Sequence, residues 1–415
     1  MKDRDLYPRR LQSRLQEALL DTPAVLIHGP RQCGKTTLAR LVGEPAGYAY
    51  FTFDDSNVLA AAREDPVGFA ERLPERVILD EVQHAPELFV LLKRAIDRDR
   101  RAGRFILTGS ANVLLLPQLS DSLAGRMEVL RLYPLAQCEL ERTAPRFLDE
   151  LFAGTLMLTH TGRLGDELAE RIVRGGYPEP QTRPTWRRRH EWYRNYIETI
   201  VQRDIRSLSR LSRGQAIPRL LELVAGQTAR LLNVSQLAAP FQLSRPTIRD
   251  YVGLIERVFL IDVVPPWHRN RLKRLIKTPK LHMGDTGLAA ALLGIDPPQL
   301  LADRHLFGQH LETFVYGEIK RQASWQDREV TFFHYRDRDL YEVDLAIEQH
   351  GGRIAGVEVK ASGTVGEKDF RGLKRLQQAA GKMFMAGVVL YDGDHILPFG
   401  ERLFAVPVSA LWGTR

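Results

Sequence analysis

Residues 29–36 read GPRQCGKT and match the pattern G-x-x-x-x-G-K-[ST]. The apolar run AVLIHG at 24–29 leads into this stretch and predicts a short buried strand. Residues 37–41 follow it and predict the first turns of a helix. A glycine-containing turn between a strand and a helix is the setting in which this pattern wraps a phosphate group. The stretch therefore predicts a phosphate-binding loop at one end of a parallel sheet.

The residue types in this loop indicate ATP and Mg²⁺ as its ligands. Glycines let backbone N–H groups curl around phosphate oxygens, and the helix N-terminus adds favourable partial charge. Lys35 would reach the β- and γ-phosphates, while Thr36 would offer its hydroxyl to Mg²⁺. Cys33 lies inside the loop, and we expect its thiol to be partly exposed and shielded by ATP. The predicted nucleotide contacts are Gly29, Pro30, Arg31, Gln32, Cys33, Gly34, Lys35, Thr36 and Thr37.

Apolar strands alternate with helical patterns through the first third of the chain. Further strands are expected at 48–53, 76–79, 104–108 and 127–132. A helix is expected before the first strand, at 8–20, and another at 87–99. This alternation predicts an α/β domain in which helices cover both faces of a parallel sheet.

Polar residues at the ends of two of these strands complete a predicted hydrolytic site. Asp80 would hold Mg²⁺ through water, and Glu81 would polarise the attacking water. Ser110 ends the next strand, where it could contact the γ-phosphate or that water. Arg126 could act as an arginine finger on a neighbouring subunit's nucleotide, or it could be a salt-bridged surface residue.

The remaining sequence predicts two further regions. A long amphipathic helix is expected at 187–211, and more helices follow. From His305 the order becomes helix, three strands, helix, strand, which is a second α/β arrangement. We therefore expect an ATPase domain at 1–140, a helical and winged-helix region at 141–300, and a C-terminal domain at 301–415.

The middle region has the layout of a winged helix-turn-helix. Two helices are expected at 229–239 and 243–256, with Ser244 capping the second and Pro246 in its first turn. A strand pair with a basic loop would follow as the wing. Such a module binds either DNA or a protein, and the basic loop favours DNA. The predicted DNA contacts are Arg245, Thr247, Arg249, Arg269, Arg271, Lys273 and Arg274.

The tail carries the elements of a nuclease centre. Asp344 lies on one predicted strand, and Glu358 and Lys360 share a face of the next. Two carboxylates could bind Mg²⁺ while the lysine assists the water nucleophile. Glu312 and Glu318, on the preceding helix, are possible extra acids. The order of elements resembles the PD-(D/E)XK nuclease fold, whose members can be active or can be retired enzymes kept for binding.

The stretches HGPRQCGKTTLAR, VILDEVQ, LTGSAN and SLAGR together resemble a family of prokaryotic AAA+-type ATPases. Members join this module to a C-terminal region of unknown function. Here 175–180 (GGYPEP), 196–205 (YIETIVQRDI) and 279–288 (PKLHMGDTGL) are similar to that region. The resemblance covers nearly the whole chain, and it implies ATP binding and a link to DNA.

Composition limits the remaining possibilities. The net charge of +8 makes an acidic partner such as DNA plausible. Two cysteines without metal spacing do not form a disulfide framework. The N-terminus lacks an apolar signal core, and no long apolar run suggests a membrane span, so we expect a cytoplasmic protein without membrane contact. An arginine finger acting between subunits would make it a homo-oligomer.

These observations predict an ATP-hydrolysing, Mg²⁺-dependent enzyme that binds or remodels DNA. The first alternative is an ATP-dependent nuclease in which the tail is active. The second is a nucleotide-switched scaffold that binds protein partners. Salt-dependent DNA binding separates the scaffold from the other two.

Overall fold

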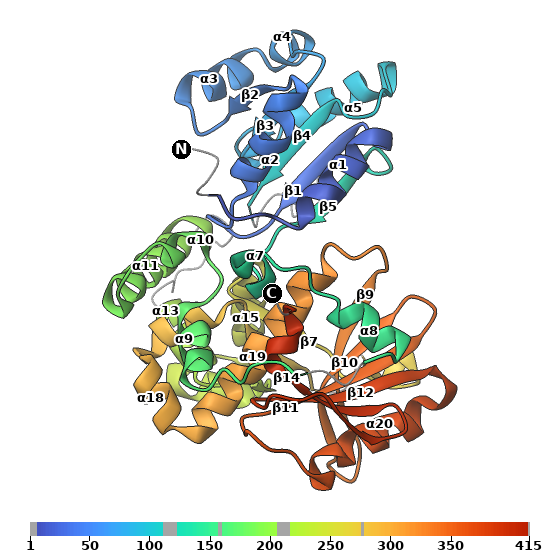
Figure 1. Cartoon of the computed structure of the whole chain (residues 1–415). Coiled ribbons are helices and arrows are strands. Elements are labelled where there is room, and N and C mark those ends of the chain that lie inside the picture. The colour runs from blue at the N-terminus through green and yellow to red at the C-terminus, as the bar shows by residue number, and fades with distance from the viewer. Residues whose placement is uncertain (1–5, 111–122, 157–159, 206–215, 275–277, 414–415) are drawn as a thin grey trace. The chain divides into compact units, whose positions relative to one another are not determined.

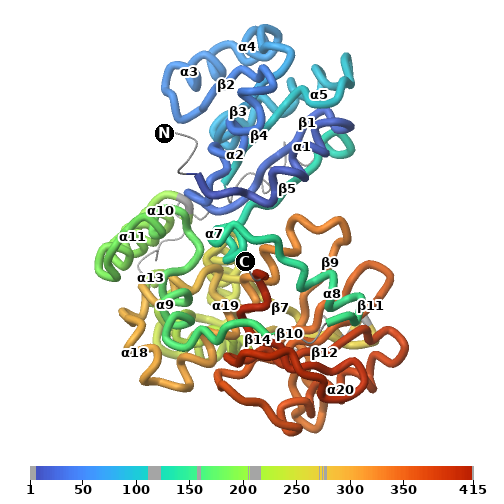
Figure 2. The backbone as a smooth tube through the Cα atoms, in the orientation of Figure 1, coloured from blue at the N-terminus to red at the C-terminus, as the bar shows by residue number. Residues whose placement is uncertain are grey.

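The computed structural model describes residues 6–110, 123–156, 160–205, 216–274 and 278–413. The chain divides into two compact units (Figures 1 and 2). The first unit comprises Met1–Leu135 with the short stretch Arg257–Phe259, and the second comprises Ala136–Glu256 and Leu260–Arg415. The regions expected at 141–300 and 301–415 thus share one compact unit.

A five-stranded parallel sheet forms the centre of the first unit, in the order β2-β3-β4-β1-β5. Its strands are β1 (Ala24–His28), β2 (Ala49–Thr52), β3 (Val77–Asp80), β4 (Phe105–Gly109) and β5 (Met127–Arg131). Each lies within a residue or two of its predicted position. In this order β4 lies between β1 and β3. The polar residues at the end of β4 therefore lie between the loop that follows β1 and the acids that end β3.

Helices cover both faces of this sheet, as the sequence predicts. On one face, Leu26, Leu79 and Leu107 pack against the buried side of α5 (Leu88–Arg98). On the other, Gly43 at the end of α2 (Lys35–Gly43) approaches Ile78 and Ile106. The remaining elements of this unit are α1 (Leu11–Asp21), α3 (Ser56–Glu64), α4 (Pro66–Glu71), and the 3-10 turns Glu44–Ala46 and Val82–His84.

The second unit contains a six-stranded mixed sheet in the order β13-β14-β12-β11-β10-β9. The predicted order of helix, three strands, helix and strand is present, and two further strands follow it. The elements are α19 (Arg304–Ala323), β9 (Val330–Arg336), β10 (Glu342–Gln349), β11 (Arg353–Lys360), α20 (Arg371–Ala380), β12 (Phe384–Tyr391), β13 (Leu397–Gly400) and β14 (Leu403–Pro407). The turns Glu367–Phe370, Gly381–Met383 and Val408–Leu411 are 3-10 helices.

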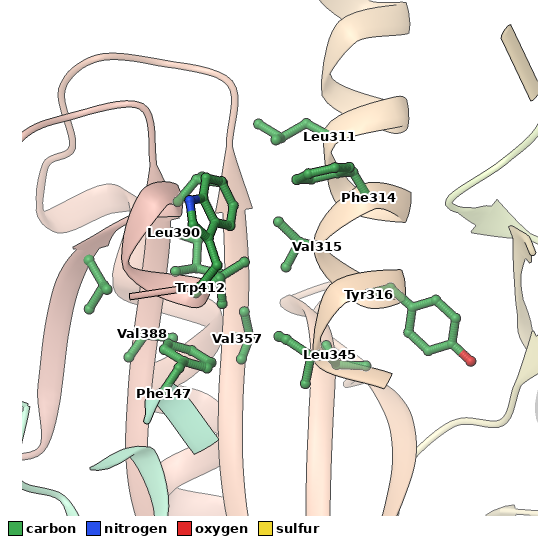
Figure 3. Close-up of a cluster of buried hydrophobic side chains, with 14 of the residues drawn as sticks. Phe147, Leu311, Phe314, Val315, Tyr316, Leu345, Val357, Val388, Leu390 and Trp412 are labelled. Atoms are coloured by element: carbon green, nitrogen blue, oxygen red, sulfur yellow. The ribbon is translucent and has the colours of Figure 1, made fainter. Parts of the chain in front are cut away.

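One face of this sheet packs against α19 to form the largest core (Figure 3). Leu311, Phe314 and Val315 project from α19 toward Leu345 and Val357 of the sheet. Segments expected to belong to the middle region join the same core through α8 (Phe147–Ala153) and α9 (Asp166–Arg174). This shared apolar core explains why residues 136–256 and 260–413 form one unit.

A small antiparallel sheet, β6-β8-β7, lies beside three helices in this unit. The order along the chain is α13 (Ala216–Ala225), β6 (Arg230–Leu231), α14 (Val234–Ala238), α15 (Arg245–Arg257), β7 (Ile261–Val264) and β8 (Lys280–Met283). The single helix predicted at 229–239 is wrong. The chain turns at Ala229 with a positive φ of 60°, pairs briefly as β6, and begins α14 only after Asn233 caps it.

The long helix predicted at 187–211 is α11 (Trp186–Thr199), which continues as a π-helix over Ile200–Ile205. The rest of that prediction lies outside the described residues. Other helices of this unit are α7 (Gln137–Glu141), α10 (Pro178–Gln181), α16 (Arg271–Arg274), α17 (Thr286–Leu293), α18 (Pro297–Ala302) and the 3-10 turn Ala239–Phe241. Across the described part of the chain, we find no helix with the length and apolar character that a bilayer crossing requires.

Candidate functional site

The loop between β1 and α2 has the backbone geometry that its glycines predict. A Cβ atom on Gly29 would stand 2.0 Å from the carbonyl oxygen of Leu132, so only glycine fits there. Gly34 has a φ of 100°, a conformation that L-residues rarely adopt. Gln32 also has a positive φ, of 58°. Non-glycine residues in this region store strain, which is common where a loop is shaped for a ligand.

Lys35 begins α2 and lies at the base of this loop. Its side chain is buried, and Nζ donates a hydrogen bond of 2.9 Å to the carbonyl oxygen of Pro30. A buried ammonium that donates a hydrogen bond to a neutral carbonyl oxygen can exchange this partner for a stronger, charged acceptor. This lysine is therefore available to a phosphate group.

Asp80 ends β3 and is bound from several sides. Its Oδ1 accepts hydrogen bonds from Thr36, at 2.8 Å, and from Thr108 on β4. Its Oδ2 accepts from Tyr50 on β2, at 3.0 Å. Burial raises the pKa of Tyr50 to about 12, and Asp80 adds to the rise, so this phenol remains a donor. The two residues predicted to hold Mg²⁺, Thr36 and Asp80, are thus in direct contact.

These donors fit a magnesium ion. A threonine hydroxyl and a carboxylate at the mouth of a phosphate loop are hard oxygen ligands, which Mg²⁺ prefers beside nucleotide phosphates. When bound, the ion would neutralise charge on the β- and γ-phosphates. Thr36 and Asp80 would hold it, and Thr108 and Tyr50 would fix the Asp80 carboxylate in place.

Glu81 stands one residue beyond the strand in a strained backbone conformation, with a φ of 56°. Its backbone N–H donates to Thr108 Oγ1 at 3.1 Å. The side chain of Gln83 links Glu81 to Ser110 by donating to both, at 3.1 Å to Ser110 Oγ. The predicted water-polarising acid and the predicted sensor serine are therefore joined through one amide.

Cys33 does not have the exposure expected from the sequence. Its side chain is fully buried, and Sγ lies 3.4 Å from the carbonyl oxygen of Leu132. Burial raises the pKa of this thiol, although Lys35 and Arg9 oppose the rise. The Cys33 side chain therefore points into the protein, toward the segment that follows β5.

Two residues near the loop were not identified from sequence. Arg9 donates at 2.6 Å to the carbonyl oxygens of both Cys33 and Tyr133, and so ties the N-terminal segment to the loop. His28 ends β1, and burial lowers its pKa to about 4, with Arg131 and Lys35 adding to the effect. No local pattern marks either residue, because their roles depend on partners distant in sequence.

Arg126 forms a two-point ion pair within its own unit. Its Nε and Nη2 donate to Asp97 of α5 at 2.6 and 3.0 Å. This matches the salt-bridged alternative in the isolated chain. A finger role would require the guanidinium to leave Asp97.

A second group of ionisable residues gathers in the second unit. Asp344 on β10 accepts a hydrogen bond of 2.9 Å from the Val359 backbone, and Lys360 donates at 2.7 Å to Glu358 on the same face of β11. The predicted pairing of β10 and β11 residues is therefore present. Lys280 of β8, which was not predicted, donates to Glu312 at 2.7 Å and to Asp344 at 3.1 Å.

Burial shapes the titration of this group. It raises the pKa of Glu358 to about 8, with Asp344 adding to the rise. It likewise raises the pKa of Glu312 well above its usual range. Burial would also raise the pKa of Asp344, but Lys280 and the Val359 N–H outweigh it and hold that pKa low.

The group does not fit a divalent cation. The described carboxylates Glu312, Asp344 and Glu358 do not bring three ligand atoms within 4.8 Å of one another. The ammonium of Lys280 instead contacts two of them. No chemical step through a metal is therefore derived for this tail.

Glu318 lies in a different network from these acids. It accepts from Arg321 at 2.7 Å and from the Gln137 backbone at 2.8 Å. Arg321 also pairs with Asp285, which in turn accepts from the Gly176 backbone. The stretches GGYPEP and PKLHMGDTGL therefore meet in a buried structural network.

The predicted DNA contacts divide by exposure. Arg245, Arg249 and Arg269 are exposed, and Ser244 caps α15 by accepting from the Thr247 N–H at 3.2 Å. Arg274 is paired with Glu348 at 2.7 Å and lies over the Phe333 ring. The side chains of Arg271 and Lys273 lie outside the described residues.

Comparison with known families agrees with this division of the chain. Residues 21–141 match the model of an AAA domain. Residues 165–299 and 307–411 match two domains of unknown function, DUF8612 and DUF4143. Together with the Lys35, Thr36 and Asp80 geometry, the first match defines the class: residues 21–141 form a P-loop domain of the AAA type, and the protein is an ATPase that binds and hydrolyses ATP.

Two curated mycobacterial proteins are similar over nearly the whole chain. They are the uncharacterized proteins Rv2008c of Mycobacterium tuberculosis and Mb2031c of Mycobacterium bovis. Each is 29% identical over 409 residues, which is 98% of this chain and 85% of the relative. The similarity thus spans both the ATPase domain and the C-terminal region of this chain.

Solved structures give only distant likenesses. The Walker-type ATPase PABY2304 of Pyrococcus abyssi has a TM-score of 0.40 and 17% identity, covering 70% of this chain and 97% of that one. The RuvB Holliday junction branch migration motor of Thermotoga maritima has a TM-score of 0.28 and 18% identity, covering 61% and 89%. DnaA of Aquifex aeolicus, with AMPPCP bound, has 0.30 and 15%, covering 59% and 86%. TM-scores this low carry no argument about function.

Proposed function

We propose that this ATPase binds DNA through the module α13–β8 and couples ATP hydrolysis to DNA binding or remodelling. One observation carries the proposal. The order helix, strand, helix, helix, strand, strand, with the three strands paired β6-β8-β7, supports a winged helix-turn-helix. In that arrangement α15 is the recognition helix and the β7–β8 connection is the wing.

The charge on this module supports DNA as its partner. Arg245 and Arg249 are exposed in the first turns of α15, which is the part of a recognition helix that enters a groove. Arg269 is exposed in the β7–β8 connection, where phosphate contacts are expected. Arg274 is removed from the predicted contacts, because Glu348 already neutralises it.

Salt dependence of DNA binding tests the proposal. The triple variant of Arg245, Arg249 and Arg269 to alanine should bind duplex DNA more weakly. The slope of log K against log salt should fall by up to about three units, because each lost phosphate contact removes about 0.9. Fluorescence anisotropy between 50 and 300 mM salt, roughly the range over which such contacts are screened, measures the slope.

A matched control separates these sites from general charge. Arginines 40, 146 and 187 are each in an exposed ion pair spaced four residues along a helix. Replacing these three by alanine removes the same net charge elsewhere. Equal effects of both triple variants would mean that DNA binding depends on general charge and not on this module. No DNA binding by the wild type would favour the protein-binding scaffold.

In the ATPase cycle we assign Lys35 to the phosphates, Glu81 to the attacking water, and Ser110 to sensing the γ-phosphate. Arg126 would complete the site of a neighbouring subunit in a homo-oligomer. Arg126→Ala should then retain nucleotide affinity and lose turnover. Asp97→Ala frees the guanidinium and should retain turnover.

Mixing inactive variants tests directly whether Arg126 acts on a neighbouring subunit. Arg126→Ala mixed with Glu81→Gln should recover activity, since some interfaces then pair an intact arginine with an intact acid. No recovery in mixtures that demonstrably exchange subunits would contradict the finger role.

A further inference from the structure

The acidic group of the tail, which consists of Glu312, Asp344 and Glu358, already contains a cation, and that cation is the side chain of Lys280. Lys280 Nζ lies 2.7 Å from Glu312 Oε1 and 3.1 Å from Asp344 Oδ1. It comes from β8 of the small sheet, whereas the acids come from α19 and β10 of the larger fold. The ammonium thus stands between two carboxylates on separate elements, where a shared divalent ion would have to bind.

Burial makes this arrangement hard to displace. The Lys280 side chain is 7% exposed, and those of Glu312 and Asp344 are 15% and 14% exposed. An ion pair at this depth is weakly screened, and removing either partner strands a buried charge. A metal entering from solvent would therefore have to displace an ammonium that two buried carboxylates hold.

Charge balance reinforces the point. Three carboxylates, Glu312, Asp344 and Glu358, face two ammonium groups, Lys280 and Lys360. Adding a divalent ion to these five groups would leave a buried excess of positive charge. The nearby rings of His282 and His334 supply no further negative charge.

One acid oxygen has no partner and shows where a ligand could enter if the lysine were absent. Glu358 Oε2 is buried without a hydrogen bond, and so is Nε2 of His282. His282 Nε2 lies 3.9 Å from Glu312. Carboxylate oxygens and an imidazole nitrogen are ligands for Mn²⁺, so the residue types around Lys280 suit a metal, although with the lysine between them the carboxylates do not bring three ligand atoms together.

We propose that Lys280 is a tethered cation that replaces the divalent metal of the tail, so that this domain is held together without metal and does not cleave DNA. The lysine fixes β8 to α19 and β10 by the same contacts that a shared ion would make. The proposal concerns the second unit and does not depend on the DNA-binding role of α15.

Mn²⁺ binding to the full-length, nucleotide-free protein tests this inference. The probe is Mn²⁺ alone, followed by electron paramagnetic resonance, in the wild type and in Lys280→Met, which keeps the length and removes the charge. We expect Lys280→Met to bind one Mn²⁺ more than the wild type. Its dissociation constant for that ion should be at least tenfold lower than that of any Mn²⁺ that the wild type binds at this position. Adding Asp344→Asn to the same variant should abolish the gain.

Lys320→Met is the matched control. Lys320 is a partly buried lysine of the same unit that pairs with Asp262 on β7, so its loss disturbs a comparable ion pair outside the acidic group. It should leave Mn²⁺ binding as in the wild type. If Lys280→Met does not fold, Lys280→Gln also removes the charge but keeps a hydrogen-bond donor for the two acids, and it should show the same gain.

Several results would overturn the inference. Wild-type Mn²⁺ binding that disappears in Asp344→Asn would show that the lysine does not exclude metal. A folded Lys280 variant with no added Mn²⁺ would show that the group is not a displaced metal site. Nicking of plasmid DNA by the wild type with Mg²⁺ or Mn²⁺, lost in Asp344→Asn from matched preparations, would establish an active nuclease.

Discussion

Each unit of this protein buries a lysine, but the two lysines are held differently. Lys35 of the phosphate loop donates to a backbone carbonyl at 2.9 Å. Lys280 of the tail donates to two carboxylates. Their exposed fractions are similar, at 4% and 5%, so burial does not explain the contrast.

The difference lies in what each ammonium can still bind. A neutral carbonyl is a weaker partner than a phosphate, so a nucleotide can recruit Lys35 at little cost. Two carboxylates at ion-pair distance hold an ammonium at least as strongly as an incoming anion would. Lys280 therefore stays bound to the protein's own acids. We therefore expect a buried lysine to bind a ligand in one unit and to act as a structural cation in the other.

The largest expected effect is on ATP turnover. Lys35→Ala should lose tight ATP binding, whereas Glu81→Gln should bind ATP and lose turnover by about 10³-fold, because only the second spares the phosphate contacts. Binding of a fluorescent nucleotide and steady-state phosphate release measure the two steps. Normal turnover by Glu81→Gln would place the catalytic base elsewhere.

The next largest effect is on stability, where the loss of Lys280 should matter more than the loss of Lys35. Lys280→Ala should lower the free energy of unfolding by about 3–5 kcal/mol, because Glu312 and Asp344 become unpaired buried charges. Lys35→Ala strands no charge and should cost far less. Far-UV circular dichroism during urea denaturation follows both units, whereas tryptophan fluorescence follows the second alone, because all five tryptophans lie between Trp186 and Trp412. Equal losses in the two variants would contradict the comparison.

Acid should weaken the first unit through His28. The folded-state pKa of His28, about 4, lies below the ordinary 6.5. Between these two pH values the unfolded chain therefore binds a proton that the folded unit does not bind. The stability is present above pH 6.5 and is lost as the pH falls toward 4. Between pH 7 and 5 this loss amounts to about 2 kcal/mol.

Hydrogen exchange of peptides covering β1 and β4 measures that loss. His28→Gln cannot titrate and should remove the pH dependence of protection in those peptides. In the second unit, acidification protonates buried histidines such as His334 but also neutralises Glu358, and these effects oppose each other. A pH dependence unchanged in His28→Gln would assign the acid sensitivity to other groups.

The smallest expected effect is on thiol labelling. Cys33 and Cys138 are both buried, so a bulky thiol reagent should label neither in the native protein, with or without ATP. Both should react after denaturation. Fast native labelling of Cys33 that ATP suppresses would mean that the loop opens far enough to turn the side chain outward.

Prediction from sequence succeeded where a function depends on local order. The phosphate loop, the five strands of the first sheet, and the pairing of Asp344 with the Glu358 strand follow from patterns a few residues long. Arg9, Gln83 and Lys280 were missed, since each acts on a partner that the sequence places elsewhere. Glu318 was grouped with Glu312 because both lie on α19, but residues six apart on a helix point in different directions.

The sequence by itself determined that this chain has a phosphate loop, because strand, turn and helix N-terminus are consecutive in the chain, and it placed a threonine and an acid where Mg²⁺ is expected to bind. It also determined that Glu358 and Lys360 share one face of β11, because a strand repeats every two residues. Only the tertiary structure decided which charges neutralise one another. Lys280 meets Glu312 and Asp344 across 32 and 64 residues, and Cys33 turns inward toward Leu132 across 99. Such contacts depend on how separate elements pack, and that packing decides whether a buried lysine is available to a ligand or neutralises the protein's own acids.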